Sequence, residues 1–289
     1  MNDALRSRLA LISAACLFST AGAAIKACQL NGWQIASFRA AVAAVVVALA
    51  LPESRRGWTR RTVLVAVAYA VTAILFVQAN KLTTAASTIF IQSASPLFIA
   101  ALAPWLLGEW PRRRDLPFMA AVLLGLALFF TGTEERHVTA PDPRLGNLVA
   151  VASSFAVAVM MIGLRWLGKT DGGNPTGAVV LGNLMAFAAA LPFALPVHAR
   201  PADVGIILYV GVFQIGLAYP LMLAWLRRVP ALEASLLMFV EPVLSPLWAW
   251  LLHGEGIGPW ALAGGGVILA ATAMRTAVDS RRPAAATAS

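Results

Sequence analysis

The sequence predicts an all-α integral membrane protein of ten transmembrane helices, arranged as two inverted five-helix repeats. Three observations lead to this fold class: the composition, the spacing of the apolar segments and an internal repeat. Of the 289 residues, 60% are hydrophobic and only 12% are charged, and the mean hydropathy is +0.77. Because soluble domains carry about 25% charged residues, a water-soluble fold could not cover this much apolar surface.

Ten apolar segments approach the ~20 residues that a helix needs to cross the hydrocarbon core of a bilayer. The connections between them are too short to hold a soluble domain. The first five segments are 9–27, 33–51, 63–80, 84–107 and 116–132. The second five are 145–167, 178–197, 204–226, 231–252 and 257–277.

The basic residues predict the orientation of these segments. With the N-terminus in the cytoplasm, most of the 22 Lys and Arg residues fall on the cytoplasmic side. Because basic loops resist translocation, we expect both termini to be cytoplasmic and the number of spans to be even. We expect the bilayer to be a bacterial inner (plasma) membrane. The residues on the other side are Lys26, Arg39, Lys81, Arg136, Arg144 and Arg200.

The net charge of +9 does not indicate nucleic-acid binding, since the basic residues form short clusters between apolar segments. Residues 163–170 satisfy a phosphate-loop pattern, but bulky Leu164 and Trp166 lie inside it at the end of a predicted helix. The three histidines are far apart in the sequence. We therefore expect no cofactor, no metal and no nucleotide.

Two pairs of landmarks recur at one constant spacing. Ser95-Pro96 and Gly108-Glu109 align without a gap on Glu241-Pro242 and Gly254-Glu255. The predicted repeats are residues 1–139 and residues 140–289, the second ending in a short cytoplasmic tail. Each repeat holds five spans, an odd number, so the second enters the membrane from the opposite side. Such inverted repeats predict alternating access to a site at the midplane.

Polar residues inside the spans mark the candidate site, because a polar group in hydrocarbon usually faces a partner helix or a cavity. At about 100° per residue, Thr84, Thr88, Gln92 and Ser95 share one face of their helix. The repeat carries this stripe to the helix that holds Met238 and Glu241. Polar contacts between helices are the alternative interpretation. The candidate substrate-binding residues are Gln78, Thr88, Gln92, Ser95, Gln214, Tyr219, Met238 and Glu241.

Glu241 is the acidic residue that lies well inside a span. Facing a cavity, its carboxylate would receive a substrate amine or cycle a proton. The alternative is a structural role, in which it pairs with backbone groups freed by Pro242.

Small residues predict close helix contacts at Ala121 and Gly125, and again along residues 263–266. Either packing within the bundle or a homodimer face would use them.

The sequence resembles the drug/metabolite transporter superfamily, specifically its EamA-type members. The resemblance covers nearly the whole chain and is carried by the ten-span plan, by Phe38-Arg39-Ala40 and by the two Pro to Gly-Glu segments. It implies a secondary transporter, not an enzyme, that exports small metabolites. The chain is most similar to YddG-type exporters of aromatic and other amino acids. Export of other metabolites or toxic compounds, a channel and an intramembrane enzyme are the alternatives.

Overall fold

The computed structural model describes residues 3–106, 108, 110–111, 113–131, 137–170, 172–226, 229 and 231–280. Within these residues the chain is helical, and an isolated bridge between His137 and Ala140 is its only extended pairing. Eight described stretches are helices long and apolar enough to cross a membrane, and Leu116–Thr131 is an apolar but shorter helix. The predicted all-helical class with several apolar helices is confirmed for this part of the chain.

The helices of the first half follow the predicted segments with small shifts at their ends. Two of those segments are each divided into two helices, at Thr20 and at Ser93–Ala94. The elements are α1 (Asp3–Ser19), α2 (Ala21–Ala27), α3 (Gly32–Ala50), η1 (Pro52–Arg55), α4 (Arg60–Leu82), α5 (Ala85–Gln92), α6 (Ser95–Leu106), η2 (Arg113–Asp115) and α7 (Leu116–Thr131).

The second half behaves in the same way. Gly163 and Gly168 of the phosphate-loop pattern lie inside a continuous helix, so the pattern forms no loop here. The elements are α8 (Pro143–Lys169), α9 (Pro175–Ala194), α10 (Pro201–Tyr209), the π-helical η3 (Val210–Leu217), α11 (Ala218–Leu226), α12 (Ala231–Met238), α13 (Val240–His253) and α14 (Pro259–Ser280). Helix α9 ends earlier than predicted because Pro196 disfavours helical backbone at the residue before it.

Prolines account for three departures from regular α-helix. A proline has no N–H and its ring clashes with the carbonyl four residues earlier. Pro96 therefore ends α5 at Gln92, and Pro242 ends α12 at Met238. Pro220 follows the π-helical turns of η3. The break at Thr20 has another cause, since its hydroxyl donates to the Leu17 carbonyl at 2.8 Å and competes with the helix ladder.

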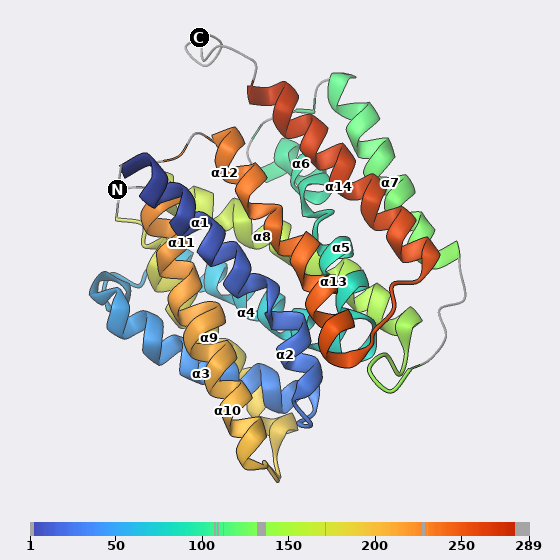
Figure 1. Ribbon diagram of the computed structural model, residues 1–289. Helices are drawn as coiled ribbons and strands as arrows, with labels where there is room; N and C mark the ends of the chain where they lie inside the picture. Colours follow the sequence, from blue (N-terminus) through green and yellow to red (C-terminus); the bar gives the residue numbers. More distant parts are fainter. Residues whose placement is uncertain are drawn as a thin grey trace.

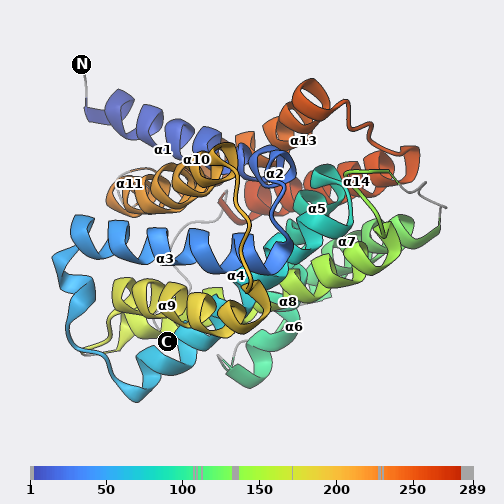
Figure 2. The same ribbon diagram turned by 90° about the horizontal axis from the view of Figure 1, so that it is seen from below.

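The two halves of the chain interleave instead of forming separate bundles. Helix α4 packs against α8 and α9, and α1 packs against α11 and α13. Figure 2 shows α3 lying between α9 on one side and the α10–α11 stretch on the other. Helix α1 begins and α14 ends in the upper part of Figure 1, whereas α2 and α13 end in its lower part. The hydrophobic clusters accordingly combine residues from both halves.

Helices α7 and α14 lie side by side at the edge of the molecule (Figure 1). The small residues that the sequence analysis noted face each other here. A Cβ added to Gly264 would lie 2.6 Å from the Gly125 carbonyl oxygen, and one added to Gly125 would lie 2.9 Å from the Gly264 carbonyl oxygen. These glycines therefore allow close contact within the bundle.

The two Gly-Glu landmarks follow the ends of helices. Gly108 follows α6 and Gly254 follows α13, and both have left-handed backbone, with φ of 69° and 63°. A helix commonly ends at a glycine in this conformation, because a Cβ would be strained there. Glu109 lies outside the described residues.

Candidate functional site

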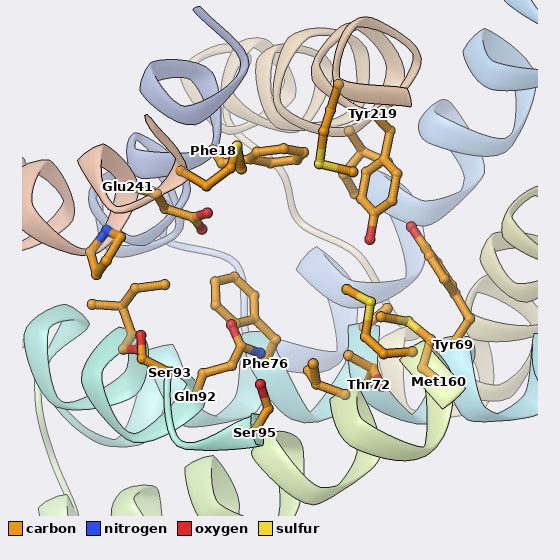
Figure 3. A pocket seen from close by; sticks show the side chains of 18 of the residues that line it. Phe18, Tyr69, Thr72, Phe76, Gln92, Ser93, Ser95, Met160, Tyr219 and Glu241 are labelled. Atoms are coloured by element: carbon orange, nitrogen blue, oxygen red, sulfur yellow. The ribbon is translucent and has the colours of Figure 1, made fainter. Parts of the chain in front are cut away.

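A cavity of about 560 Å³ lies in the centre of the bundle. Its walls come from both halves of the chain, with α1, α3, α4, α5 and α6 contributing from the first and α8, η3, α11, α12, α13 and α14 from the second. Figure 3 shows side chains pointing into this space from several helices. A cavity of this size is within the usual range for small-molecule sites.

The structure brings most of the predicted site residues to this cavity. Glu241 and Tyr219 lie on one side in Figure 3, and Gln92 and Ser95 lie across from Glu241. The predicted residues that line the cavity are Gln92, Ser95, Gln214, Tyr219, Met238 and Glu241.

Gln78 and Thr88 do not reach the cavity. The Gln78 side chain packs against Gly32, where an added Cβ would lie 2.2 Å from its Oε1. The Thr88 hydroxyl is buried and donates to the Thr84 carbonyl at 3.0 Å. Gln92, one turn further along α5, reaches the cavity, whereas the Thr88 hydroxyl is bonded within its own helix. Thr88 therefore contributes to packing within α5.

The break between α5 and α6 lies directly at the cavity wall. Pro96 cannot donate to the Gln92 carbonyl, which instead accepts a hydrogen bond from the Ser154 hydroxyl at 3.3 Å. The Gln92 side chain donates to the Ser153 hydroxyl at 3.2 Å. These bonds to α8 satisfy polar groups that would be costly in a lipid environment.

An aromatic and thioether wall makes up much of the remaining surface. The Phe18 and Tyr219 rings meet edge to face with centroids 5.5 Å apart, and the Tyr69 and Tyr219 centroids are 6.2 Å apart. Met160 lies beside Tyr69 in Figure 3. Such a wall suits an apolar group on a ligand.

The contribution of α4 to this wall was not predicted from the sequence. Tyr69, Thr72, Ala73 and Phe76 all line the cavity. Their spacing of three and four residues places them on one face of α4. That spacing was visible in the sequence, but aromatic residues on an apolar helix occur just as often at ordinary helix contacts.

Two ionisable side chains of opposite charge line the cavity, Glu241 and Arg39. The Glu241 carboxylate points into the open space in Figure 3. It makes no hydrogen bond or ion pair with another residue in the described part of the chain. An unpaired carboxylate beside an aromatic wall can receive a cationic group.

A buried ion pair lies at one end of the bundle. The Lys26 and Glu255 side chains are only 1% and 4% exposed, and Nζ lies 3.4 Å from Oε1. Lys26 also donates to the carbonyls of Thr83, at 2.6 Å, and Thr139. Glu255 accepts from the backbone N–H of Ala85 at 3.2 Å, at the first turn of α5. This cluster, here called the Lys26 seal, joins α2, α5 and the connection after α13.

Further bonds surround the Lys26 seal. His253 bonds to the Ala23 carbonyl at 2.8 Å, and Lys81 donates to the Cys28 carbonyl at 2.6 Å. Burial raises the pKa of the Glu255 carboxyl, and the Lys26 ammonium opposes that shift. The ionised carboxylate is therefore costly at this position, and its cationic partner offsets part of the cost.

The cavity extends away from the Lys26 seal. Ile99, Met222 and Thr272, which line it, lie past the middle of their helical stretches as counted from the sealed end. Ile89 and Phe76 line it in the halves of their helices nearer Lys26, so the cavity spans the middle of the bundle.

Comparison with known families identifies the chain. The model of the EamA-like transporter family matches residues 6–131 and residues 144–276. This chain belongs to the EamA-like transporter family. The resemblance to the drug/metabolite transporter superfamily is thereby confirmed, and the protein is a membrane transporter of small substrates.

A solved crystal structure shares the fold of this EamA-like transporter. The two align with a TM-score of 0.62 and 18% identity over 96% of this chain and 99% of the other. No curated protein matches the chain. The family match therefore carries the assignment, and the central cavity is the candidate place for the substrate of this EamA-like transporter.

Proposed function

We propose that this EamA-like transporter exports small amphipathic metabolites, with amino acids, including aromatic ones, as its main cargo. The observation that carries the proposal is the central cavity, where the unpaired Glu241 carboxylate faces an aromatic wall of Phe18 and Tyr219. The carboxylate would receive the substrate's amine, and the rings would contact its side chain. This cargo also fits the similarity to YddG-type exporters.

We further propose that ten spans cross a bacterial inner membrane, with both termini in the cytoplasm. The two spans to be added to the eight long apolar stretches are α7 and the broken pair α12–α13. An even number of spans is supported by the clustering of Lys and Arg on one side. In this orientation the Lys26 seal is on the outer side and the cavity extends toward the cytoplasm.

Alternating access between two inverted repeats is the proposed mechanism. Two matches to one family model, one in each half, support the repeat. The left-handed glycines Gly108 and Gly254 support it as well. Closure at the Lys26 seal, with the cavity extending to the other side, suits the inward-facing member of a pair of conformations. Substrate would enter from the cytoplasm, and rocking of the halves would then open the Lys26 seal.

Counterflow in proteoliposomes tests this function. Vesicles loaded with unlabelled phenylalanine should accumulate labelled phenylalanine transiently, and the rate should saturate with concentration. The assay is repeated with a panel of amino acids, with and without a proton gradient. If the wild-type protein exchanges no amino acid, the proposed cargo is wrong. A flux that never saturates would favour a channel.

A further inference from the structure

The guanidinium of Arg39 is an unsatisfied charge in the wall of the cavity. Arg39 is 3% exposed and lies on α3, yet it lines the cavity. Its Nη2 donates to the Ala73 carbonyl at 3.1 Å. Its Nε and Nη1 are buried and have no hydrogen-bond partner within the part of the chain that the structure describes.

Two neighbours of Arg39 hold it in place without neutralising it. The guanidinium carbon lies 5.7 Å from the centre of the Phe76 ring, which is a favourable cation–π distance. Together with the bond to Ala73, this contact holds Arg39 against the face of α4 that lines the cavity. Neither contact supplies the negative charge that a buried guanidinium requires.

The carboxylate of the cavity does not fill this role. No ion pair joins Arg39 to Glu241 or to any other acidic side chain among the described residues. Glu241 comes from α13, whereas Arg39 packs on α4, and the α4 residue Tyr69 lies across the cavity from Glu241 in Figure 3. The lining of the cavity thus includes an unpaired cation, whose Nε and Nη1 are buried in this conformation, and an unpaired anion on a different helix.

We propose that Arg39 binds the carboxylate of the substrate. This inference rests on the proposed function and narrows its cargo to metabolites that carry a carboxylate. The free N–H groups of Nε and Nη1 lie on different edges of the planar guanidinium, so one of them, together with the second N–H of Nη2, supplies the donors for the oxygens of one carboxylate. A zwitterion would then lie across the cavity, with its carboxylate on Arg39, its amine on Glu241 and its side chain on the aromatic wall.

Competition in the counterflow assay tests this binding site. The probes are phenylalanine and phenylalaninamide, which keeps the amine and the ring but lacks the carboxylate. With the wild type we expect the amide to compete at least about tenfold more weakly, as expected for loss of a charge-assisted bond. In the Arg39→Gln protein, phenylalanine should compete only as strongly as phenylalaninamide does. Competition by phenylalaninamide itself should be the same as with the wild type.

Two further variants complete the experiment. Arg39→Lys keeps the charge without the planar fork and should show an intermediate preference. Arg144→Gln removes an exposed arginine and should retain the wild-type preference. If Arg39→Gln does not fold, Arg39→Lys is used for the test instead. If Arg39→Lys then prefers phenylalanine over phenylalaninamide as strongly as the wild type does, the proposal is overturned. Equal competition by amide and amino acid in the wild type would overturn it as well.

A binding measurement separates this inference from the proposed function. If the wild type exchanges no amino acid, purified protein is heated with 3-phenylpropionate, which has the carboxylate and the ring but no amine. The proposal expects this acid to raise the Tm of the wild type and not that of Arg39→Gln. The same Tm change in both proteins, or none in either, would show that Arg39 does not bind carboxylates.

Discussion

At the scale of the residue, Glu241 has the clearest predicted effect. Its carboxylate lies in the central cavity, points into it and has no partner in the described part of the chain. Neutral glutamine has nearly the same shape, so Glu241→Gln removes the charge and leaves the packing beside Pro242 unchanged. The substitution therefore separates the functional role from the structural role.

We expect Glu241→Gln to fold and to lose at least about tenfold in the rate of amino-acid exchange, because one ionic contact is worth ~1.5–3 kcal/mol. The measurement is counterflow at several pH values, with gel filtration to check folding. Glu53→Gln, which changes an exposed carboxylate, is the control. Full activity at every pH would leave Glu241 with a structural role only.

At the scale of the element, the contact between α7 and α14 depends on the absence of side chains. Gly264 packs directly on the backbone of α7, whereas a Cβ added to Gly266 would meet nothing within 4 Å. The same substitution at these two positions of one helix thus has opposite expected effects. Helix propensity alone would favour alanine at both by about 1 kcal/mol.

Gly264→Ala should destabilise the protein by about 1–3 kcal/mol, because its Cβ would force the two helices apart. Gly266→Ala should leave the Tm unchanged or raise it slightly. Both are measured as thermal unfolding in detergent. Equal Tm values for the two variants would show that the α7–α14 contact adapts without cost.

At the scale of the whole molecule, the Lys26 seal lies at one end of the bundle and brings together residues from both halves. Both charged partners are buried, so removing one charge leaves the other charge unpaired. Removing both charges leaves no unpaired charge. Cys28 is buried at this end and is a natural probe of opening. A Cys16→Ser background leaves it as the single thiol of the chain.

We expect Glu255→Gln or Lys26→Met alone to speed labelling of Cys28 by an impermeant maleimide about tenfold, since an unpaired buried charge costs several kcal/mol. The double variant Lys26→Met with Glu255→Gln should label more slowly than either single variant. Additive effects in the double variant would mean that the ion pair does not hold the seal.

The sequence was sufficient to predict the helices but not all of the cavity. Apolar length locates helices whatever their tertiary contacts, which is why the predicted segments and the observed elements agree closely. Polar groups inside apolar helices need a partner or a cavity. For this reason the sequence could indicate the cavity residues Gln92, Ser95, Gln214 and Glu241. Phe76 gave no such signal, because its ring is ordinary on an apolar helix.

Other parts of the site depend on tertiary geometry. Thr88 shares a helical face with Gln92, yet its hydroxyl is buried on its own helix and only Gln92 reaches the cavity. Arg39 matched a family pattern, but its free N–H groups become visible only when its neighbours are placed. Likewise, the pairing of Lys26 with Glu255 joins residues from opposite ends of the chain.

The π-helical segment η3 determines which face of α11 meets the cavity. A π-helix accommodates an extra residue, so conversion of η3 to α geometry would rotate α11 by about 100° and shift it by ~1.5 Å along its axis. Tyr219 would then turn away from the Phe18 and Tyr69 rings and out of the aromatic wall. The pitch of eight residues in one helix therefore determines whether Tyr219 belongs to the aromatic wall.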